Sequence, residues 1–336
     1  MKINAMAAMK TKEQLRSWSY DSANLGLFDC LMKVKSCGIC HSDIHMIDND
    51  WGFSRYPLVP GHEIVGEIVQ VGSEVKHLKV GDRVGVGWQS GACLQCEDCL
   101  KGNDNMCSAS TGVISHGYGG FADHAVLDSR YCFVIPKGIE TDVAGPLMCG
   151  GVTVYGALRS AGMSSGQEIG VIGIGGLGHM AVQFAAKLGN RVTVFTTSKD
   201  KAEFAAKMGA SEAIVTPSGT APKAPARPLN IIISTVTVEM DHNPYVDLLA
   251  TDGTLTFVGA PSMAMPLNIQ LGKLLFKRRR IMGSIIGSRA MIVDMLSVAD
   301  RFGVKPIIEK FPLSECNKAM DKVRQNKIRY RAVLTA

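Results

Sequence analysis

Residues 168–190 read EIGVIGIGGLGHMAVQFAAKLGN, and this stretch decides the fold of the second half of the chain. An apolar segment precedes Gly173, Gly175 and Gly178, and apolar side chains then recur at helical spacing as far as Leu188. A lone GxGxxG pattern is weak evidence in a chain with 36 glycines, but a strand before it and a helix after it are the context that dinucleotide binding requires. The helix N-terminus would present N–H groups and partial positive charge to a pyrophosphate. The predicted contacts in this turn are Gly173, Gly175, Gly176, Leu177 and Gly178.

The periodicity of apolar residues predicts two different patterns of secondary structure along the chain. From about Pro146 onwards, strand-like and helix-like segments alternate, which predicts a parallel, doubly wound α/β sheet. The segment from Ile64 to Val86 instead alternates apolar residues with Gly, Asp and Lys, which is typical of short twisted strands. Residues 217–228 are rich in Pro, Ala, Ser and Lys, and they predict an irregular connection. With 336 residues, the chain fits two domains.

The residues after the second strand of the sheet decide which dinucleotide binds. An acidic side chain about twenty residues after the glycines would hold the ribose hydroxyls of NAD. Thr197 stands at that place instead, among hydroxyl and cationic residues, and Asp200 is displaced along the chain. A 2′-phosphate needs small donors and a cation, and a carboxylate would repel it. The sequence therefore favours NADPH over NAD, which stays the alternative, and the predicted contacts are Thr196, Thr197, Ser198 and Lys201.

Four cysteines lie within residues 91–107, GACLQCEDCLKGNDNMC, at a spacing that can surround one tetrahedral metal ion. Disulfides suit small secreted domains rather than a chain of this length. A bacterial iron–sulfur motif has three residues between its last two cysteines and a proline after the last one. Here seven residues separate Cys99 from Cys107, and Ser108 follows. We therefore predict a closed, structural zinc site that stabilises a loop. Its ligands would be Cys93, Cys96, Cys99 and Cys107.

Cys40 in CGICHSD, His62 in PGHEIVGE and Cys149 in LMCGGVTVY lie in contexts that indicate chemistry. One histidine and two cysteines can hold zinc and leave a fourth position for water or substrate. Spacing alone leaves this grouping open, because three distant residues could each belong to a core. The other cysteines have no metal-like spacing, and we interpret them as inert buried residues: Cys30, Cys37, Cys132 and Cys316.

Composition excludes several classes of protein. The formal net charge of +6 is modest, aromatic residues make up only 6% of the chain, and the densest basic run is Lys277 to Arg280, which we interpret as a solvated face. Nucleic-acid binding would need a longer basic stripe with stacking aromatics. The N-terminal residues lack a secretory apolar region, and no apolar stretch is long enough to span a bilayer. We predict a cytoplasmic protein with neither a nucleic-acid nor a membrane partner.

Taken in order, CGICHSD, PGHE, the cysteine loop, LMCGG and GIGGLG closely resemble the zinc-dependent medium-chain alcohol dehydrogenases over essentially the whole chain. Within that family the chain looks most like the cinnamyl-alcohol-dehydrogenase-like group. MIDNDWGFSRYPLVPGHE, GPLMCGGVTV and KIRYRAVL resemble its NADPH-dependent bacterial aldehyde reductases in particular. The resemblance implies a GroES-like catalytic domain at residues 1–148 and 287–336, with the structural-zinc loop at 91–108. It implies a Rossmann domain at residues 149–286.

The resemblance also implies the roles of individual residues. Cys40, His62 and Cys149 would bind a catalytic zinc, the second zinc of the chain, with Glu63 and Asp43 supporting them. Ser42 would hydrogen-bond the substrate oxygen, and His45 would end a proton relay. The cofactor would contact His41 and Arg331 near its pyrophosphate, Thr153 near its nicotinamide, and also Thr235, Val236, Val258, Gly259 and Ala260. Trp51 and Trp88 would line the substrate pocket, although both could equally be core residues.

The expected enzyme transfers hydride between NADPH and a broad range of aromatic or straight-chain aldehydes. An NAD-dependent alcohol or polyol dehydrogenase is the alternative. A zinc-free quinone or enoyl reductase, or a non-catalytic relative, is disfavoured because all the metal ligands are present, and a redox sensor built on the cysteine loop is a third possibility. Homodimers through the edge of the Rossmann sheet are common in the family, and Ile281 to Gly287 could supply that edge or be an internal strand.

Overall fold

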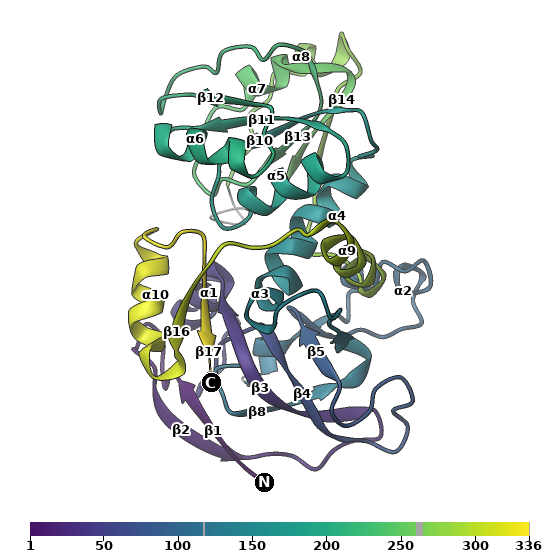
Figure 1. Ribbon diagram of the computed structural model, residues 1–336, viewed down its shortest axis with the longest axis vertical. Coiled ribbons are helices and arrows are strands. Elements are labelled where there is room, and N and C mark those ends of the chain that lie inside the picture. The colour runs from purple at the N-terminus through teal and green to yellow at the C-terminus, as the bar shows by residue number, and fades with distance from the viewer. Residues whose placement is uncertain (117, 260–264, 336) are drawn as a thin grey trace. The chain divides into compact units, whose positions relative to one another are not determined.

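The computed structural model describes residues 1–116, 118–259 and 265–335 (Figure 1). The chain divides into two compact units. Unit 1 comprises Met1–Cys149, Ser288–Arg301 and Pro306–Ala336, and unit 2 comprises Gly150–Gly287 and Phe302–Lys305. Among the helices of the described residues, none is both long enough and apolar enough to cross a membrane.

Unit 1 is built on a sheet in the order β16-β17-β3-β4-β5-β9, with β8 also paired to β3. Its central strand β3 (Asp29–Ile39) reads DCLMKVKSCGI and is buried along most of its length. Every pairing is antiparallel except that of β16 with β17. The other strands are β4 (Glu63–Val71), β5 (Arg83–Val86), β8 (His124–Asp128), β9 (Phe133–Val134), β16 (Ile308–Pro312) and β17 (Arg331–Thr335). Two small two-stranded sheets, β1–β2 (Lys2–Ala7, Arg16–Asp21) and β6–β7 (Gln89–Gly91, Thr111–Gly112), complete the unit.

Most helices of unit 1 are short. Helix α1 (His41–Asp48) follows β3 directly, and α3 (Thr141–Pro146) packs on β3 and β4. Helix α2 (Glu97–Leu100) lies in the cysteine loop. The chain returns to unit 1 through α9 (Arg289–Phe302) and α10 (Cys316–Arg324). A large core of buried apolar side chains lies in the unit and includes Met32, Ile64, Phe121 and Leu334.

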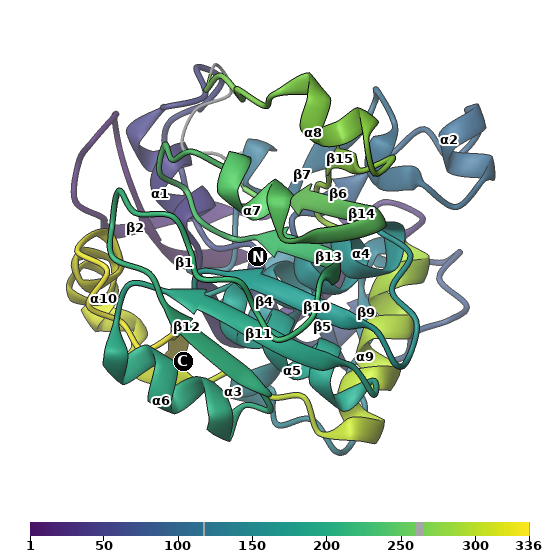
Figure 2. The same cartoon turned by 90° about the horizontal axis from the view of Figure 1, so that it is seen from above.

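Unit 2 is a parallel six-stranded sheet in the order β12-β11-β10-β13-β14-β15, and its strands lie side by side in Figure 2. The strands are β10 (Glu168–Ile172), β11 (Arg191–Thr196), β12 (Glu212–Val215), β13 (Leu229–Ser234), β14 (Leu249–Phe257) and β15 (Arg280–Gly283). Helices α5 (Gly178–Lys187) and α6 (Lys199–Lys207) cover one face, and α7 (Asn243–Asp247) and α8 (Leu271–Leu275) lie on the other (Figure 1). Helix α4 (Val152–Ser160) packs on α5.

The strand order confirms the predicted doubly wound sheet, because the chain moves outward from β10 in one direction and then in the other. The first third of the chain is rich in short strands, as predicted. Residues 217–228 form an irregular connection between β12 and β13. The strand candidate from Ile281 to Gly287 is shorter than expected, ends at Gly283 and forms the edge of the sheet beyond β14.

The prediction that the basic run Lys277 to Arg280 is solvated is confirmed for three of its residues and wrong for Arg279. Arg279, in the basic run Lys277 to Arg280, is 9% exposed rather than solvated. Its guanidinium donates to the backbone oxygens of Leu249 (2.7 Å), Asp247 (3.0 Å) and Lys273 (3.2 Å). A buried guanidinium needs several acceptors, and three backbone carbonyl groups supply them here. The run therefore contains a structural residue that ties α7 and α8 to the start of β14.

Candidate functional site

Cys40, His62 and Cys149 come together in unit 1 because of how β3 and β4 pair. Cys40 directly follows β3, and His62 directly precedes β4. Since these strands are antiparallel, with Gly38 opposite Glu63, the end of one lies beside the start of the other. Cys149 reaches the same place from a π-helical turn, Leu147–Gly151, that follows α3.

The donor atoms of this cluster fit a zinc ion. His62 Nε2 lies 3.2 Å from Cys149 Sγ, which lies 3.9 Å from Cys40 Sγ. Two thiolates on a tetrahedral zinc would be about 3.8 Å apart. Glu63 also places a carboxylate oxygen within the group, in which all donor atoms lie within 4.8 Å of one another. Two sulfur atoms and one imidazole nitrogen are the ligands of an open site with room for a substrate.

The two thiols of the cluster differ in acidity. A hydrogen bond between them lowers the pKa of Cys40 well below that of an ordinary cysteine and raises the pKa of Cys149 well above it. The cluster thus already favours one thiolate, and a bound cation would favour the second.

Asp43 orients His62 from within the core. Its side chain is fully buried, and Oδ1 lies 2.8 Å from His62 Nδ1 and accepts the backbone N–H of Gly61 at 2.9 Å. Oδ2 accepts the backbone N–H of Cys40 at 2.9 Å. Burial opposes a charged imidazole, but the charge and hydrogen bond of Asp43 raise the pKa of His62 well above its usual value. With Nδ1 facing Asp43, Nε2 faces the two sulfur atoms, as a metal ligand must.

Glu63 and Arg331 form a buried ion pair beside the same cluster. Arg331 begins β17, which pairs with β3 on the side opposite β4. Burial raises the pKa of Glu63 to about 7, against the opposing charge of Arg331. Glu63 Oε2 and Arg331 Nε find no hydrogen-bond partner among the described residues, so each keeps a polar atom available at the site. The expected contact of Arg331 with a pyrophosphate stays a prediction.

A row of aromatic side chains begins at the cluster. The ring of Trp88 lies edge-on to His62 with centroids 5.2 Å apart, and Trp51 lies edge-on to Trp88 at 5.6 Å. Phe53 stacks on Trp51 at 5.9 Å and is 48% exposed. Both tryptophans are only partly buried and pack at the margin of the core. Phe53 was not predicted from the sequence, although its position two residues after Trp51 was a signal.

Three further predicted residues lie on α1. Ser42 Oγ is 3.8 Å from Cys40 Sγ, which places the hydroxyl beside the metal ligands. His45 follows one turn later, and its Nδ1 lies 2.7 Å from Asp50 Oδ2 at the surface. His41 is exposed at the first residue of the helix. The helix therefore leads from the cluster towards solvent.

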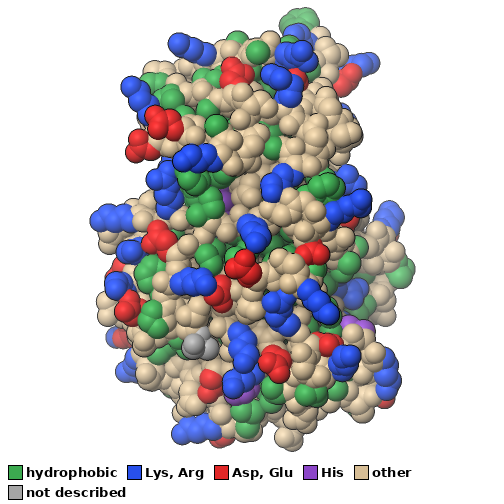
Figure 3. Space-filling view, in the orientation of Figure 1, with side chains coloured by type: hydrophobic (Ala, Val, Ile, Leu, Met, Phe, Trp, Pro, Cys, Tyr) green, Lys and Arg blue, Asp and Glu red, His purple; other side chains and the backbone are tan. Residues whose placement is uncertain are grey.

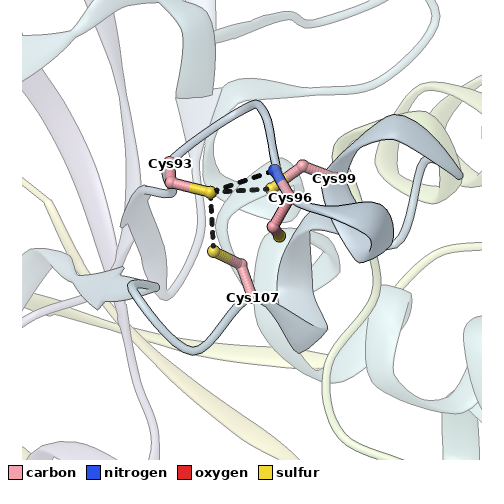
Figure 4. A group of neighbouring side chains, drawn as sticks. All are labelled: Cys93, Cys96, Cys99 and Cys107. Carbon is pink, nitrogen blue, oxygen red and sulfur yellow. Dashed lines mark hydrogen bonds between the residues drawn. The ribbon is translucent and has the colours of Figure 1, made fainter.

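The four predicted loop cysteines also come together, as Figure 4 shows. Cys93 Sγ lies 3.5 Å from Cys107 Sγ and 4.0 Å from Cys99 Sγ. Backbone N–H groups of Gln95 and Cys96 lower the pKa of Cys93 to about 6, which favours the thiolate that binds metal. Four sulfur donors complete a tetrahedron and leave no open position, so this cluster suits a structural zinc.

In unit 2, the predicted dinucleotide residues gather at the carboxyl ends of four neighbouring strands. The glycine turn follows β10 and leads into α5, with Gly173 at a φ of 86°. Thr196 ends β11, and Ser198 caps α6 by accepting the backbone N–H of Lys201 at 3.4 Å. Thr235 and Val236 follow β13, and Val258 and Gly259 follow β14. Thr153 is buried in α4, Thr197 and Lys201 are exposed, and Ala260 lies outside the described residues.

The carboxyl ends of these four strands flank the point between β10 and β13 where the direction of the strand order reverses. Ligands of doubly wound sheets bind at that point. Thr235 Oγ1 donates to the backbone oxygens of Ile172 (3.0 Å) and Gly173 (3.2 Å), so the turn is held from the neighbouring strand.

Family models match both parts of the chain. Residues 27–137 match the alcohol dehydrogenase GroES-like domain, and residues 176–301 match the zinc-binding dehydrogenase domain. An aldehyde reductase from Synechocystis sp., AdhA, is 40% identical over 333 residues, which cover 99% of this chain and 98% of the relative. The chain belongs to the zinc-binding alcohol dehydrogenases.

Solved structures agree with that assignment and place the dehydrogenase in the cinnamyl-alcohol-dehydrogenase-like group. A cinnamyl alcohol dehydrogenase from Sorghum bicolor is 36% identical with a TM-score of 0.91, covering 100% of this chain and 98% of that one. The Helicobacter pylori protein of the same group, solved with NADP(H), is 28% identical with a TM-score of 0.90 and the same coverage. The resemblance and the fold class inferred from the sequence are confirmed, and the dehydrogenase is an oxidoreductase of the alcohol dehydrogenase and aldehyde reductase type.

Two alanine variants separate the structural and binding roles of the glycine turn. A Cβ on Gly178 would lie 1.9 Å from the backbone oxygen of Gly173, whereas one on Gly175 would meet nothing within 4 Å. We expect Gly178→Ala to destabilise the protein by about 1–3 kcal/mol, as overpacking does, and to weaken dinucleotide binding. Gly175→Ala should leave the unfolding temperature unchanged and weaken binding alone, because its methyl group would occupy the approach of the pyrophosphate. Thermal unfolding and fluorescence titration with NADPH measure both effects, and unchanged values for Gly178→Ala would contradict this account.

Proposed function

We propose that this protein is a zinc-dependent, NADPH-linked aldehyde reductase that also oxidises primary alcohols. The observation that carries the proposal is the open donor set of Cys40, His62 and Cys149, with the aromatic row beginning at His62. Zinc at this donor set would polarise a carbonyl oxygen, and NADPH would supply the hydride. The partner is a small molecule, and we propose neither a nucleic-acid nor a membrane partner. Figure 3 shows cationic and anionic side chains interspersed on the face in view, which agrees with this choice. The cytoplasmic location stays a prediction.

The chain's own residues would position the substrate and move its proton. Asp43 fixes the ring of His62, so the donor set is already assembled. Ser42, beside Cys40, would hydrogen-bond the substrate oxygen and pass a proton to it. His45, one turn further along α1 and bound to Asp50 at the surface, would resupply that proton from solvent. Glu63 would assist exchange of the ligand at the open position, with Arg331 balancing its charge.

The aromatic row supports flat or unbranched aldehydes as substrates. Trp88 and Trp51 present large, rigid rings next to the cluster, and Phe53 extends the row to the surface. Aromatic rings stack well on planar substrates, and bulky walls exclude hindered ketones. A broad range of aromatic and straight-chain aldehydes is therefore the substrate class that we propose.

The end of β11 supports NADPH as the cofactor. Thr197 and Lys201 are exposed there, and Ser198 lies between them at the start of α6. Hydroxyl groups, a lysine and a helix N-terminus together suit a phosphate. The NADP(H) in the Helicobacter pylori relative supports the same choice. We propose that the cell uses the enzyme for aldehyde reduction, because cells generally keep NADPH reduced.

The edge of the sheet in unit 2 supports a homodimer. Leu271, Leu275 and Phe276 are 66%, 65% and 92% exposed in and just after α8, a few residues before the edge strand β15. A cluster of exposed apolar side chains beside an open sheet edge is a surface that proteins usually cover. We propose that a second copy of the chain covers it.

Metal removal and cofactor choice test the proposed reaction together. We expect the protein as purified to oxidise NADPH with benzaldehyde and hexanal much faster than NADH, and to lose this activity on dialysis against a strong zinc chelator. Added zinc should restore the rate, because the donor set is preassembled by Asp43. Initial rates and zinc content measured in parallel check this. A preference for NADH would overturn the NADPH assignment, and metal-independent turnover would overturn the catalytic metal.

Lys201→Ala tests the 2′-phosphate contact. A charge-assisted hydrogen bond contributes about 1.5 kcal/mol, so the KM for NADPH should rise about tenfold while the KM for NADH stays the same. Lys207→Ala, at the other end of α6, is the matched control and should change neither value. Equal changes for both cofactors in Lys201→Ala would show that this lysine does not read the phosphate.

Phe276→Ser tests the dimer. Light scattering should show a dimer for the unmodified protein and a larger monomer fraction for this variant, because the most exposed apolar side chain of the cluster is removed. Leu100→Ser alters a residue of α2 in unit 1 that is 76% exposed, and it should leave the dimer intact. A monomeric unmodified protein at micromolar concentration would rule out the proposed assembly.

A further inference from the structure

Two cysteines outside both metal clusters lie next to each other in unit 1. The sulfur atoms of Cys30 and Cys132 are 3.5 Å apart, although the residues are separated by 102 positions in the chain. Cys30 is the second residue of β3, and Cys132 ends the 3₁₀ turn Ser129–Tyr131. Both side chains are buried, with exposures of 0% and 4%. The six cysteines of the metal clusters are different residues.

The contacts on either side hold the two sulfur atoms in place. Cys30 pairs with Leu127 of β8, and the chain then turns back at Asp128. The backbone N–H of Ser129 donates to the backbone oxygen of Phe28 at 2.9 Å, and the backbone N–H of Cys132 donates to the backbone oxygen of Ser129 at 3.0 Å. The turn is thus held to the start of β3 through Phe28, two residues before Cys30. This arrangement leaves the two thiols facing each other.

A surface groove gives access to one member of the pair. The groove has a volume of about 670 Å³, lies within unit 1, and is lined by Cys132 together with residues such as Arg130, Phe133 and Leu296. Cys30 does not line the groove. A small oxidant entering from solvent would therefore meet Cys132 first.

We propose that Cys30 and Cys132 form a redox-active dithiol that a hydroperoxide converts to a disulfide, while the six cysteines of the metal clusters remain bound to zinc. In the first step the sulfur of Cys132 attacks the outer oxygen of the hydroperoxide, the O–O bond breaks, and a sulfenic acid and an alcohol (water when the oxidant is hydrogen peroxide) are formed. In the second step the sulfur of Cys30 attacks that sulfenic sulfur, the S–S bond forms, and water leaves with the thiol proton. Two thiols are oxidised by two electrons, and one hydroperoxide is reduced.

The surroundings of the two thiols determine how fast they are oxidised and how the disulfide changes the stability of the protein. Hydrogen bonding to Cys30 and burial raise the pKa of Cys132 well above its usual value, so the thiolate is scarce at neutral pH. At pH values below that pKa, the rate of oxidation of Cys132 should therefore rise about tenfold for each unit by which the pH is raised. The new bond would close a long loop between β3 and the turn, which raises stability by restricting the unfolded chain. Cys40 lies at the far end of β3, about 30 Å away along the strand, so the metal cluster there should be unaffected.

The site is independent of the function proposed above, because neither thiol belongs to a metal cluster, and peptide mapping of the zinc-loaded protein tests it directly. Trypsin would place Cys30 in the peptide of residues 17–33 and Cys132 in the peptide of residues 131–137, each with a single cysteine. After hydrogen peroxide at pH 7 and pH 8, alkylation and digestion without reductant, we expect these two peptides to be cross-linked, more rapidly at pH 8. A chromogenic chelator present during the reaction should record no release of zinc.

Variants and stability provide the controls. Cys30→Ser and Cys132→Ser should each abolish the cross-link, and Cys316→Ser, a buried cysteine of α10, should leave it intact. Oxidation should raise the unfolding midpoint of the unmodified protein by several degrees, reversibly with dithiothreitol, and should not do so in Cys132→Ser. The proposal is overturned if both peptides remain fully alkylated after oxidation, or if the cross-link forms only once zinc has been released. The mapping of the unmodified protein decides the question even if a variant does not fold.

Discussion

The pairing of β3 with its two neighbours is the constraint on which the candidate active site depends. The register of β3 with β4 places Cys40 beside His62, and the register of β3 with β17 brings Arg331 to Glu63. A shift of one residue in either register would turn these side chains to the opposite face of the sheet. The core of unit 1 is therefore also what specifies the site, because the buried face of β3 fixes both registers.

The same place gathers charges that a core does not normally tolerate. Asp43, His62 and Glu63 are fully buried, and Arg331 is nearly so. Asp43 is satisfied by two backbone N–H groups and the ring of His62, whereas Glu63 keeps one oxygen without a partner among the described residues. An unpaired buried carboxylate oxygen is costly, which fits a site where a cation is expected to lie close by. The costly buried charge therefore lies at the site where the chemistry is proposed.

Features encoded in short segments could be predicted from the sequence, and those encoded in strand register could not. The glycine turn and the four-cysteine loop each lie within twenty residues, so their spacing is visible in the chain. The grouping of Cys40 with Cys149 was reached only through resemblance to a family. The pairs Glu63 with Arg331 and Cys30 with Cys132 were not predicted, because 268 and 102 residues separate them. Burial of Arg279 was mispredicted for a related reason, since its acceptors are carbonyl groups up to 32 residues away.

The cysteines of this chain show how the local environment changes the chemistry of one kind of side chain. Cys93 receives backbone N–H groups, which favour a thiolate and a metal. Cys40 and Cys149 share a hydrogen bond that lowers the pKa of Cys40 and raises that of Cys149, beside an imidazole that supplies a third donor. Cys132 faces the backbone oxygen of Asp128 at 3.6 Å and the thiol of Cys30, an environment that raises its pKa, and among the described residues it belongs to no group that could hold a metal ion. The direction of the neighbouring dipoles, together with burial, thus sets the pKa of each of these thiols.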